Sequence, residues 1–141
     1  MKKIAALLCA FALVFSLCAC SNTSTISVPD GLDKNTLILS GQAVVTKLNK
    51  GEYSAVQAMF REDVASALSE TAVEDMALAY LSDAGEFKKF SSTEAFGKTD
   101  TASGERYGVV MVVAKYKKEK LTFHVGFDTE MQLIGLSIEE S

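Results

Sequence analysis

The chain has 141 residues, a formal net charge of −4 and 48% hydrophobic residues, which suits one domain with a packed core. Its acidic balance argues against nucleic acid as a partner, because phosphate backbones attract basic surfaces. The cysteines are Cys9, Cys18 and Cys20, all within the first twenty residues. The remainder of the chain can therefore form neither a disulfide nor a cysteine-ligated metal site.

The first twenty residues combine a basic start, an apolar run and an end of small residues. Lys2 and Lys3 precede an apolar run over residues 4–17 that only Ser16 interrupts. This order predicts a secretory signal peptide over residues 1–19. An uncleaved membrane anchor fits less well, because a spanning helix needs about 18 or more apolar residues.

The end of this segment, Leu17-Cys18-Ala19-Cys20, resembles the lipobox of bacterial lipoproteins. In that family the signal is cut just before a cysteine whose thiol carries a diacyl lipid. The resemblance implies lipid attachment at Cys20 and an extracytoplasmic protein anchored to the cell membrane. Cys18 fits less well, because the bulky Leu17 directly precedes it. A plain secreted protein is the remaining alternative, but it would not need a cysteine at the cleavage point.

The next segments predict a tether and then helices. Residues 20–35 are polar and contain Pro29, so they predict a flexible tether, and residues 36–141 form a single domain. Apolar residues recur with helical spacing from Thr36 to a stop at Gly51. The same spacing predicts a short second helix over residues 53–60 and a third over residues 71–84. Residues 64–68 fit either a helical turn or a short extended piece.

Beyond Gly85 the hydrophobic period changes from helical to alternating. We predict strands over residues 87–96, 105–117, 121–127 and 133–138. About three helices followed by about four antiparallel strands predict an α+β fold, with the helices packed on one face of the sheet. Residues 109–114 are apolar on both alternating sides, so we expect the second face to be covered as well. A homodimer through the sheet would cover it.

Several sequence pieces resemble domain of unknown function 3887, a module of bacterial secreted proteins. They are residues 42–53, residues 84–89 and Gly135-Leu136, and the resemblance extends over about residues 37–138. It implies a cone-like fold similar to the nuclear-transport-factor-two-like (SnoaL-type) folds, in which a curved sheet wraps a long helix. It brings no defined catalytic residues, because its motifs specify fold rather than reaction.

The residues suited to catalysis are few and scattered. His124 is the only histidine, and its strand position favours a surface or interface imidazole. Adjacent carboxylates fit solvated faces, because neighbours on a helix do not face one another. A paired acid–base site through long-range contacts stays open. These carboxylates are Glu62-Asp63, Glu74-Asp75 and Glu139-Glu140. We assign no catalytic residue, and we expect no metal and no cofactor.

Two further groups of residues suggest binding surfaces. Cone folds often hold a pocket between helix and sheet, and aromatic side chains here could line one or simply pack in the core. These are Tyr80, Phe87, Tyr107 and Phe127. A basic hairpin could contact lipid headgroups or an anionic wall polymer, or it could be a solubilising strand edge. Its residues are Lys115, Lys117, Lys118 and Lys120.

Taken together, these features favour a membrane-tethered extracytoplasmic lipoprotein that acts as a non-catalytic binding or accessory module. The ligand or protein partner is not encoded in any motif. The first alternative is a small cone-fold enzyme of the isomerase or hydrolase type, acting on an apolar small molecule. That enzyme would need a pocket containing an acidic or phenolic group with a displaced pKa. The second alternative is a protein-interaction subunit that works through the sheet face.

Overall fold

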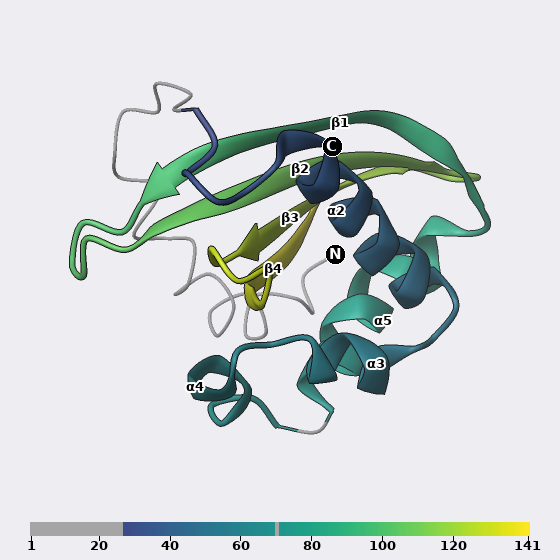
Figure 1. The fold of residues 1–141 in the computed structure, drawn as a ribbon. Helices are drawn as coiled ribbons and strands as arrows, with labels where there is room; N and C mark the ends of the chain where they lie inside the picture. The colour runs from purple at the N-terminus through teal and green to yellow at the C-terminus, as the bar shows by residue number, and fades with distance from the viewer. Residues whose placement is uncertain (1–26, 70) are drawn as a thin grey trace.

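The computed structural model describes residues 27–69 and 71–141 (Figure 1). Its helices are α2 (Lys34–Asn49), α3 (Tyr53–Ala58), α4 (Glu62–Ala65) and α5 (Ala72–Ala84). The strands follow as β1 (Phe87–Thr99), β2 (Arg106–Tyr116), β3 (Lys120–Phe127) and β4 (Leu133–Glu140). They form one antiparallel sheet in the order β1-β2-β3-β4. The predicted α+β class is confirmed, whereas the predicted signal peptide and Cys20 lie outside the described residues.

Helix α2 begins two residues earlier than the sequence predicted. The Asp33 carboxylate caps it by accepting a hydrogen bond from the Thr36 backbone N–H at 2.8 Å. Just before the helix, Pro29 is buried, and Val28 and Leu32 pack against the core. The chain therefore packs on the domain from residue 28 onward, within the segment predicted as a tether.

Four helices are present in the described residues, where the sequence predicted about three. The additional helix is α4, in a region whose pattern fitted either a turn or an extended piece. A helix of one turn is too short to show a hydrophobic period, so the pattern could not decide. Val64 of α4 packs against a small cluster formed by Tyr107, Val109 and Ile134. That cluster is separate from the main core, so the helices do not cover one face of the sheet alone.

The main core lies between α2, α5 and the inner face of the sheet. Along β2, Val110, Val112 and Ala114 point into this core and are fully buried. Tyr107 and Val109 alternate with them and point to the outer face. Gly41 allows α2 to approach β2 closely, because a Cβ there would lie 2.5 Å from Val110 Cγ1. Helix α2 contacts β1 and β2 in this way, and α5 contacts β4 (Figure 1).

The antiparallel order gives the sheet two different ends. The β1–β2 and β3–β4 turns share one end with α4, and we call it the acidic end for its residues Asp63, Glu105 and Asp128. The β2–β3 hairpin shares the other end with the start of β1. We call this the lysine end for its lysines on α2, β1 and the hairpin. They are Lys47, Lys50, Lys88, Lys89, Lys115, Lys117, Lys118 and Lys120.

Candidate functional site

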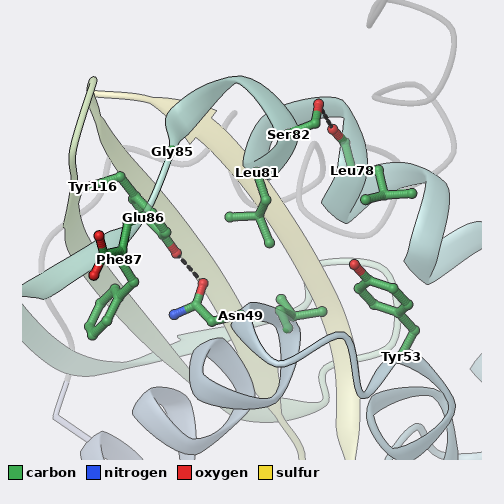
Figure 2. Close-up of a pocket in the computed structure, with 10 residues that line it drawn as sticks. Asn49, Tyr53, Leu78, Leu81, Ser82, Gly85, Glu86, Phe87 and Tyr116 are labelled. Atoms are coloured by element: carbon green, nitrogen blue, oxygen red, sulfur yellow. Dashed lines mark hydrogen bonds between the residues drawn. The ribbon is translucent and has the colours of Figure 1, made fainter.

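A pocket of about 410 Å³ opens at the lysine end, between the helices and the start of the sheet (Figure 2). This volume lies at the lower end of the range for small-molecule sites. The lining comes from α2, α3, α5, β1 and β2 and is largely apolar. Its residues are Leu48, Asn49, Tyr53, Leu78, Leu81, Ser82, Gly85, Glu86, Phe87 and Tyr116.

The corner between α5 and β1 builds one wall of the pocket. Gly85 ends α5 with a positive φ of 83°, a conformation that glycine adopts without strain. The β2–β3 hairpin is fastened to this corner by two backbone hydrogen bonds. The Lys117 N–H donates to the Glu86 carbonyl at 2.8 Å, and the Lys118 N–H donates to the Ala84 carbonyl at 2.9 Å. The corner and the hairpin therefore form one continuous edge beside the pocket.

A tyrosine and an asparagine form a polar pair in the pocket. The Tyr116 hydroxyl donates to Asn49 Oδ1 at 2.6 Å (Figure 2). In this arrangement the Asn49 amide nitrogen points to the Phe87 side. Burial raises the pKa of Tyr116 to about 12, and the hydrogen bond with Asn49 opposes this only in part. Tyr116 is therefore a neutral phenol at neutral pH, and it acts as a hydrogen-bond donor rather than a base.

The apolar wall of the pocket is partly open to solvent. Phe87 lies at the start of β1, with its ring centroid 5.6 Å from that of Tyr116 and 5.1 Å from that of Phe90. Leu78 is 42% exposed, and with Leu39 it is one of the exposed large hydrophobic residues in the described chain. An exposed leucine beside a pocket offers apolar surface that a ligand can cover.

The sequence-predicted pocket residues are not brought together. Phe87 lines the pocket, whereas Tyr80 and Phe127 belong to the main core. Tyr107 lies in the outer-face cluster, where its hydroxyl is buried without a hydrogen-bond partner among the described residues. No motif in the sequence marks Asn49, Tyr53, Leu78 or Leu81 as pocket residues. The one available signal was the grouping of polar Asn49 and aromatic Tyr53 on either side of Gly51, where α2 ends.

The remaining candidates for chemistry either contact another side chain or are exposed to solvent. His124 Nε2 lies 3.0 Å from Glu139 Oε1 on the outer face of the sheet. Glu74 and Glu140 are exposed, as expected for solvated carboxylates. Within residues 27–69 and 71–141, no group of three or more histidine, cysteine, aspartate or glutamate residues could hold a metal ion. In the same residues, none of the helices has the length and apolar character to cross a membrane.

Asp63 belongs to a network around Arg61 at the acidic end. The Arg61 guanidinium donates to Asp63 Oδ1 at 2.7 Å, to Glu105 Oε2 at 2.6 Å and to Asp128 Oδ2 at 3.4 Å. The hydrogen bond from Arg61 lowers the pKa of the Asp63 carboxyl. Asp128 Oδ1 also accepts hydrogen bonds from the backbone N–H groups of Glu130 and Gln132. The network joins α4 to both turns at this end, which is a structural role.

The order of helices and strands, and the pocket at their junction, define a small α+β module. The chain belongs to the family described as protein of unknown function DUF3887, whose model matches residues 42–136. It is similar to a solved structure, the "NMR structure of protein from Ruminococcus gnavus ATCC 29149". The two chains are 25% identical with a TM-score of 0.68, over 80% of this chain and 96% of that chain. None of the curated proteins compared with the chain matches it.

The extent of this similarity bears on how the domain folds. Because 96% of the neighbouring chain is covered, that protein consists almost wholly of this fold and was solved in solution by NMR. The described residues of the present chain likewise contain a large buried core. The domain of residues 27–141 is therefore a suitable unit for experiments on its own.

Proposed function

We propose that this protein is a membrane-tethered extracytoplasmic lipoprotein whose domain is a non-catalytic binding module. The pocket at the lysine end is its binding site. The observation that carries this proposal is the combination of an apolar, partly open wall with the hydrogen-bonded pair of Asn49 and Tyr116. Such a combination of apolar surface and few fixed polar groups is typical of small-molecule sites.

The polar side chains of the pocket support binding over catalysis. Tyr116 is bonded to Asn49, the Ser82 hydroxyl donates to the Leu78 carbonyl at 2.5 Å, and Glu86 lies 3.4 Å from Lys88 Nζ. A general acid or base must be within reach of the substrate and matched in pKa to its task. The raised pKa of Tyr116 moves that group away from base catalysis near neutral pH. An isomerase or hydrolase is therefore the less supported alternative.

A neutral apolar dye tests whether the pocket binds ligands at all. We expect Nile red to increase its fluorescence with the domain of residues 27–141. Leu81→Asp should reduce this increase at least several-fold, because it places a charge on the pocket wall. Leu39→Asp is the matched control, since Leu39 is exposed on α2 and does not line the pocket. Equal binding by both variants, or no fluorescence increase with wild type, would contradict the proposal.

The membrane tether rests on the lipobox-like sequence ending at Cys20. Two acyl chains would hold the protein firmly, since each buried methylene contributes about 0.8 kcal/mol. We expect mass spectrometry of the native amino terminus to find a lipid on Cys20. Cys20→Ala should lose lipidation and partition less with membranes, whereas Cys18→Ala should behave as wild type. A Cys20→Ala protein with unchanged lipidation would overturn this part of the proposal.

We further propose that the module is related to the nuclear-transport-factor-two-like cone folds. The long strands β1 and β2 arch over α2, which supports this relation (Figure 1).

A homodimer through the outer face of the sheet is the second alternative for how the protein acts. The half-buried Met111 and Val113 on that face favour it. Sedimentation at micromolar concentration should then show a dimer that Met111→Lys disrupts, and a strict monomer would exclude it.

A further inference from the structure

We propose that the pocket at the lysine end binds an anionic amphiphile. The ligand has a single alkyl or aryl chain that lies on the apolar wall and a phosphate or carboxylate headgroup held by Lys117 and Lys118. This inference rests on the proposed function in one respect, namely that the pocket is a binding site. It adds the chemical class of the ligand.

The apolar wall determines the chain of the ligand. Leu48 from α2, Leu81 from α5 and Phe87 from β1 line the pocket from separate elements. Leu78 extends this surface toward solvent. Covering such surface with an apolar chain contributes roughly 25 cal/mol for each Å² removed from water. A purely polar ligand would leave this contribution unused.

The position of two lysines determines the headgroup. A Cβ added at Gly85, which lines the pocket, would lie 3.2 Å from Lys117 Cβ and 3.6 Å from Lys118 Cγ. Both lysine stems therefore start beside the pocket wall. Both residues are exposed, and neither forms an ion pair among the residues that the structure describes. From stems that start beside Gly85, their flexible side chains can bring the ammonium groups to an anion bound in the pocket.

A second donor group lines the pocket at the end of α2. Asn49 Oδ1 already accepts the Tyr116 hydroxyl, so the side-chain atom left for a ligand is the donor nitrogen Nδ2. Lys50 follows directly and is exposed. Donors from α2 and from the hairpin are thus available at this end of the domain, and several donors suit a headgroup rich in acceptor oxygens.

The acidic groups near the pocket do not reverse this preference. Glu86 is the carboxylate in the lining, and Lys88 Nζ lies 3.4 Å from it. Glu119 stands in the hairpin between Lys118 and Lys120, so lysines flank it. A lysine ammonium group is a compact charge and lacks the planar set of donors of an arginine guanidinium. The lysines therefore favour an anion without requiring one particular shape. The class is therefore an anionic headgroup rather than one specific acid.

Titration of the domain of residues 27–141 with short amphiphiles tests the proposal. Octyl phosphate, octanoate and uncharged octyl glucoside are compared by calorimetry at low ionic strength, each below its micelle concentration. We expect saturable binding of octyl phosphate or octanoate that is about tenfold tighter than that of octyl glucoside, equivalent to about 1.4 kcal/mol. The affinity for the anion should fall as salt screens the exposed charges.

A matched pair of double variants tests the role of the lysines. Lys117→Glu with Lys118→Glu should weaken binding of octyl phosphate about tenfold or more and leave octyl glucoside unchanged. Lys34→Glu with Arg106→Glu changes the net charge equally but lies away from the pocket, so it should bind as wild type. Amide NMR spectra check that each variant keeps its fold.

Two results would overturn the proposal. The first is octyl glucoside binding as tightly as both anions, which would leave a pocket for apolar chains without preference for charge. The second is that neither anion binds, although Nile red still binds to wild type and this binding is still reduced by Leu81→Asp. In both cases the binding module of the proposed function stands and the ligand class is wrong. Loss of Nile red binding as well would instead mean that the proposed function itself fails.

Discussion

The two ends of the sheet satisfy their charges in opposite ways. At the acidic end, three carboxylates surround the Arg61 guanidinium within 2.6 to 3.4 Å. At the lysine end, Lys117 and Lys118 are exposed beside an open pocket and have no ion-pair partner among the described residues. Charges that are paired inside the protein contribute to its structure, whereas unpaired charges beside apolar surface are available to a ligand. The acidic end therefore has a structural role, and the unpaired lysines are consistent with the binding role proposed for the other end.

The largest effect is expected at the acidic end. Arg61→Met should lower the free energy of unfolding by about 2–3 kcal/mol at pH 7, because it removes charge-assisted hydrogen bonds and leaves Asp128 short of a partner. The Asp128 side chain is only 6% exposed, so water replaces the guanidinium poorly. Urea denaturation measures the difference. Arg106→Met is the control and should stay within about 0.5 kcal/mol of wild type; equal losses would mean that the network has no structural role.

At the lysine end, high pH should weaken the fold through Tyr116. Its pKa is raised from 10.0 to about 12 by burial, so the folded state favours the neutral phenol. The associated stability is complete below pH 10 and is lost as the pH rises from about 10 to 12. Denaturation as a function of pH should show this loss, and Tyr116→Phe should lack that part of it. Identical alkaline profiles would contradict the assignment.

Removing the Tyr116 hydroxyl should have a smaller effect at neutral pH. Tyr116→Phe keeps the ring but loses the hydrogen bond to Asn49, so we expect a loss of about 1 kcal/mol in unfolding free energy. Tyr53→Phe is the control within the same pocket, because the Tyr53 hydroxyl has no hydrogen bond to a described residue. If both changes have the same effect in thermal denaturation, the polar pair does not stabilise the pocket.

Acid should reduce the contribution of the Arg61 network. The Asp63 pKa lies below its ordinary value of 3.8, chiefly because of the hydrogen bond from Arg61. A carboxyl group whose pKa is lower in the folded state stabilises the fold at pH values above its pKa in the unfolded state. This stabilisation is lost as the pH falls through its pKa in the folded state. The stability gap between wild type and Arg61→Met should therefore narrow below about pH 4. A gap that stays constant from pH 7 to pH 2 would exclude this ion pair as a source of stability.

The smallest effect concerns like charges on the outer face at the lysine end. Lys115 is registered directly opposite Lys89 on β1 and opposite Lys120 on β3. Like charges in opposite positions are destabilising, so Lys115→Thr should raise the unfolding free energy by a few tenths of a kcal/mol. The gain should disappear at about 1 M salt, where the Debye length is near 3 Å. A gain that salt does not change would point to strand propensity instead.

The fold was largely predictable, because each long element carries a clear hydrophobic period. Apolar spacing marked α2 and α5, and the change to alternation after Gly85 marked the strands. Helix α4 was not predictable, since one turn shows no period. The sequence also could not predict on which face of the sheet Tyr107 lies. Strand β2 is apolar on both faces, and alternation alone does not say which face meets the helices.

The pocket was much less predictable than the fold. Of the residues predicted to line a pocket, Phe87 lines this one, whereas Tyr80 and Phe127 are buried in the main core. Their sequence positions do not distinguish a pocket wall from a packed core. The pocket exists because the chain reverses at Gly85 and the hairpin is bonded to that corner. This junction brings together residues that are far apart in the sequence, from the end of α2 to the end of β2. A local pattern of residue spacing cannot predict such a contact. Asn49 therefore looked like an ordinary polar residue at a helix end.

Under the proposed lipidation of Cys20, the place where the described chain enters the domain bears on which end faces the membrane. A Cβ added at Gly97, near the end of β1, would lie 3.2 Å from Pro29 Cδ, so the chain enters the domain near the acidic end. Strand β2 has 11 residues, and at about 3.3 Å per residue it separates the two ends by roughly 35 Å. A lipid on Cys20 would hold the entry side near the bilayer, where acidic groups repel anionic headgroups. The pocket would then open outward and collect its ligand from the surroundings rather than from the membrane below.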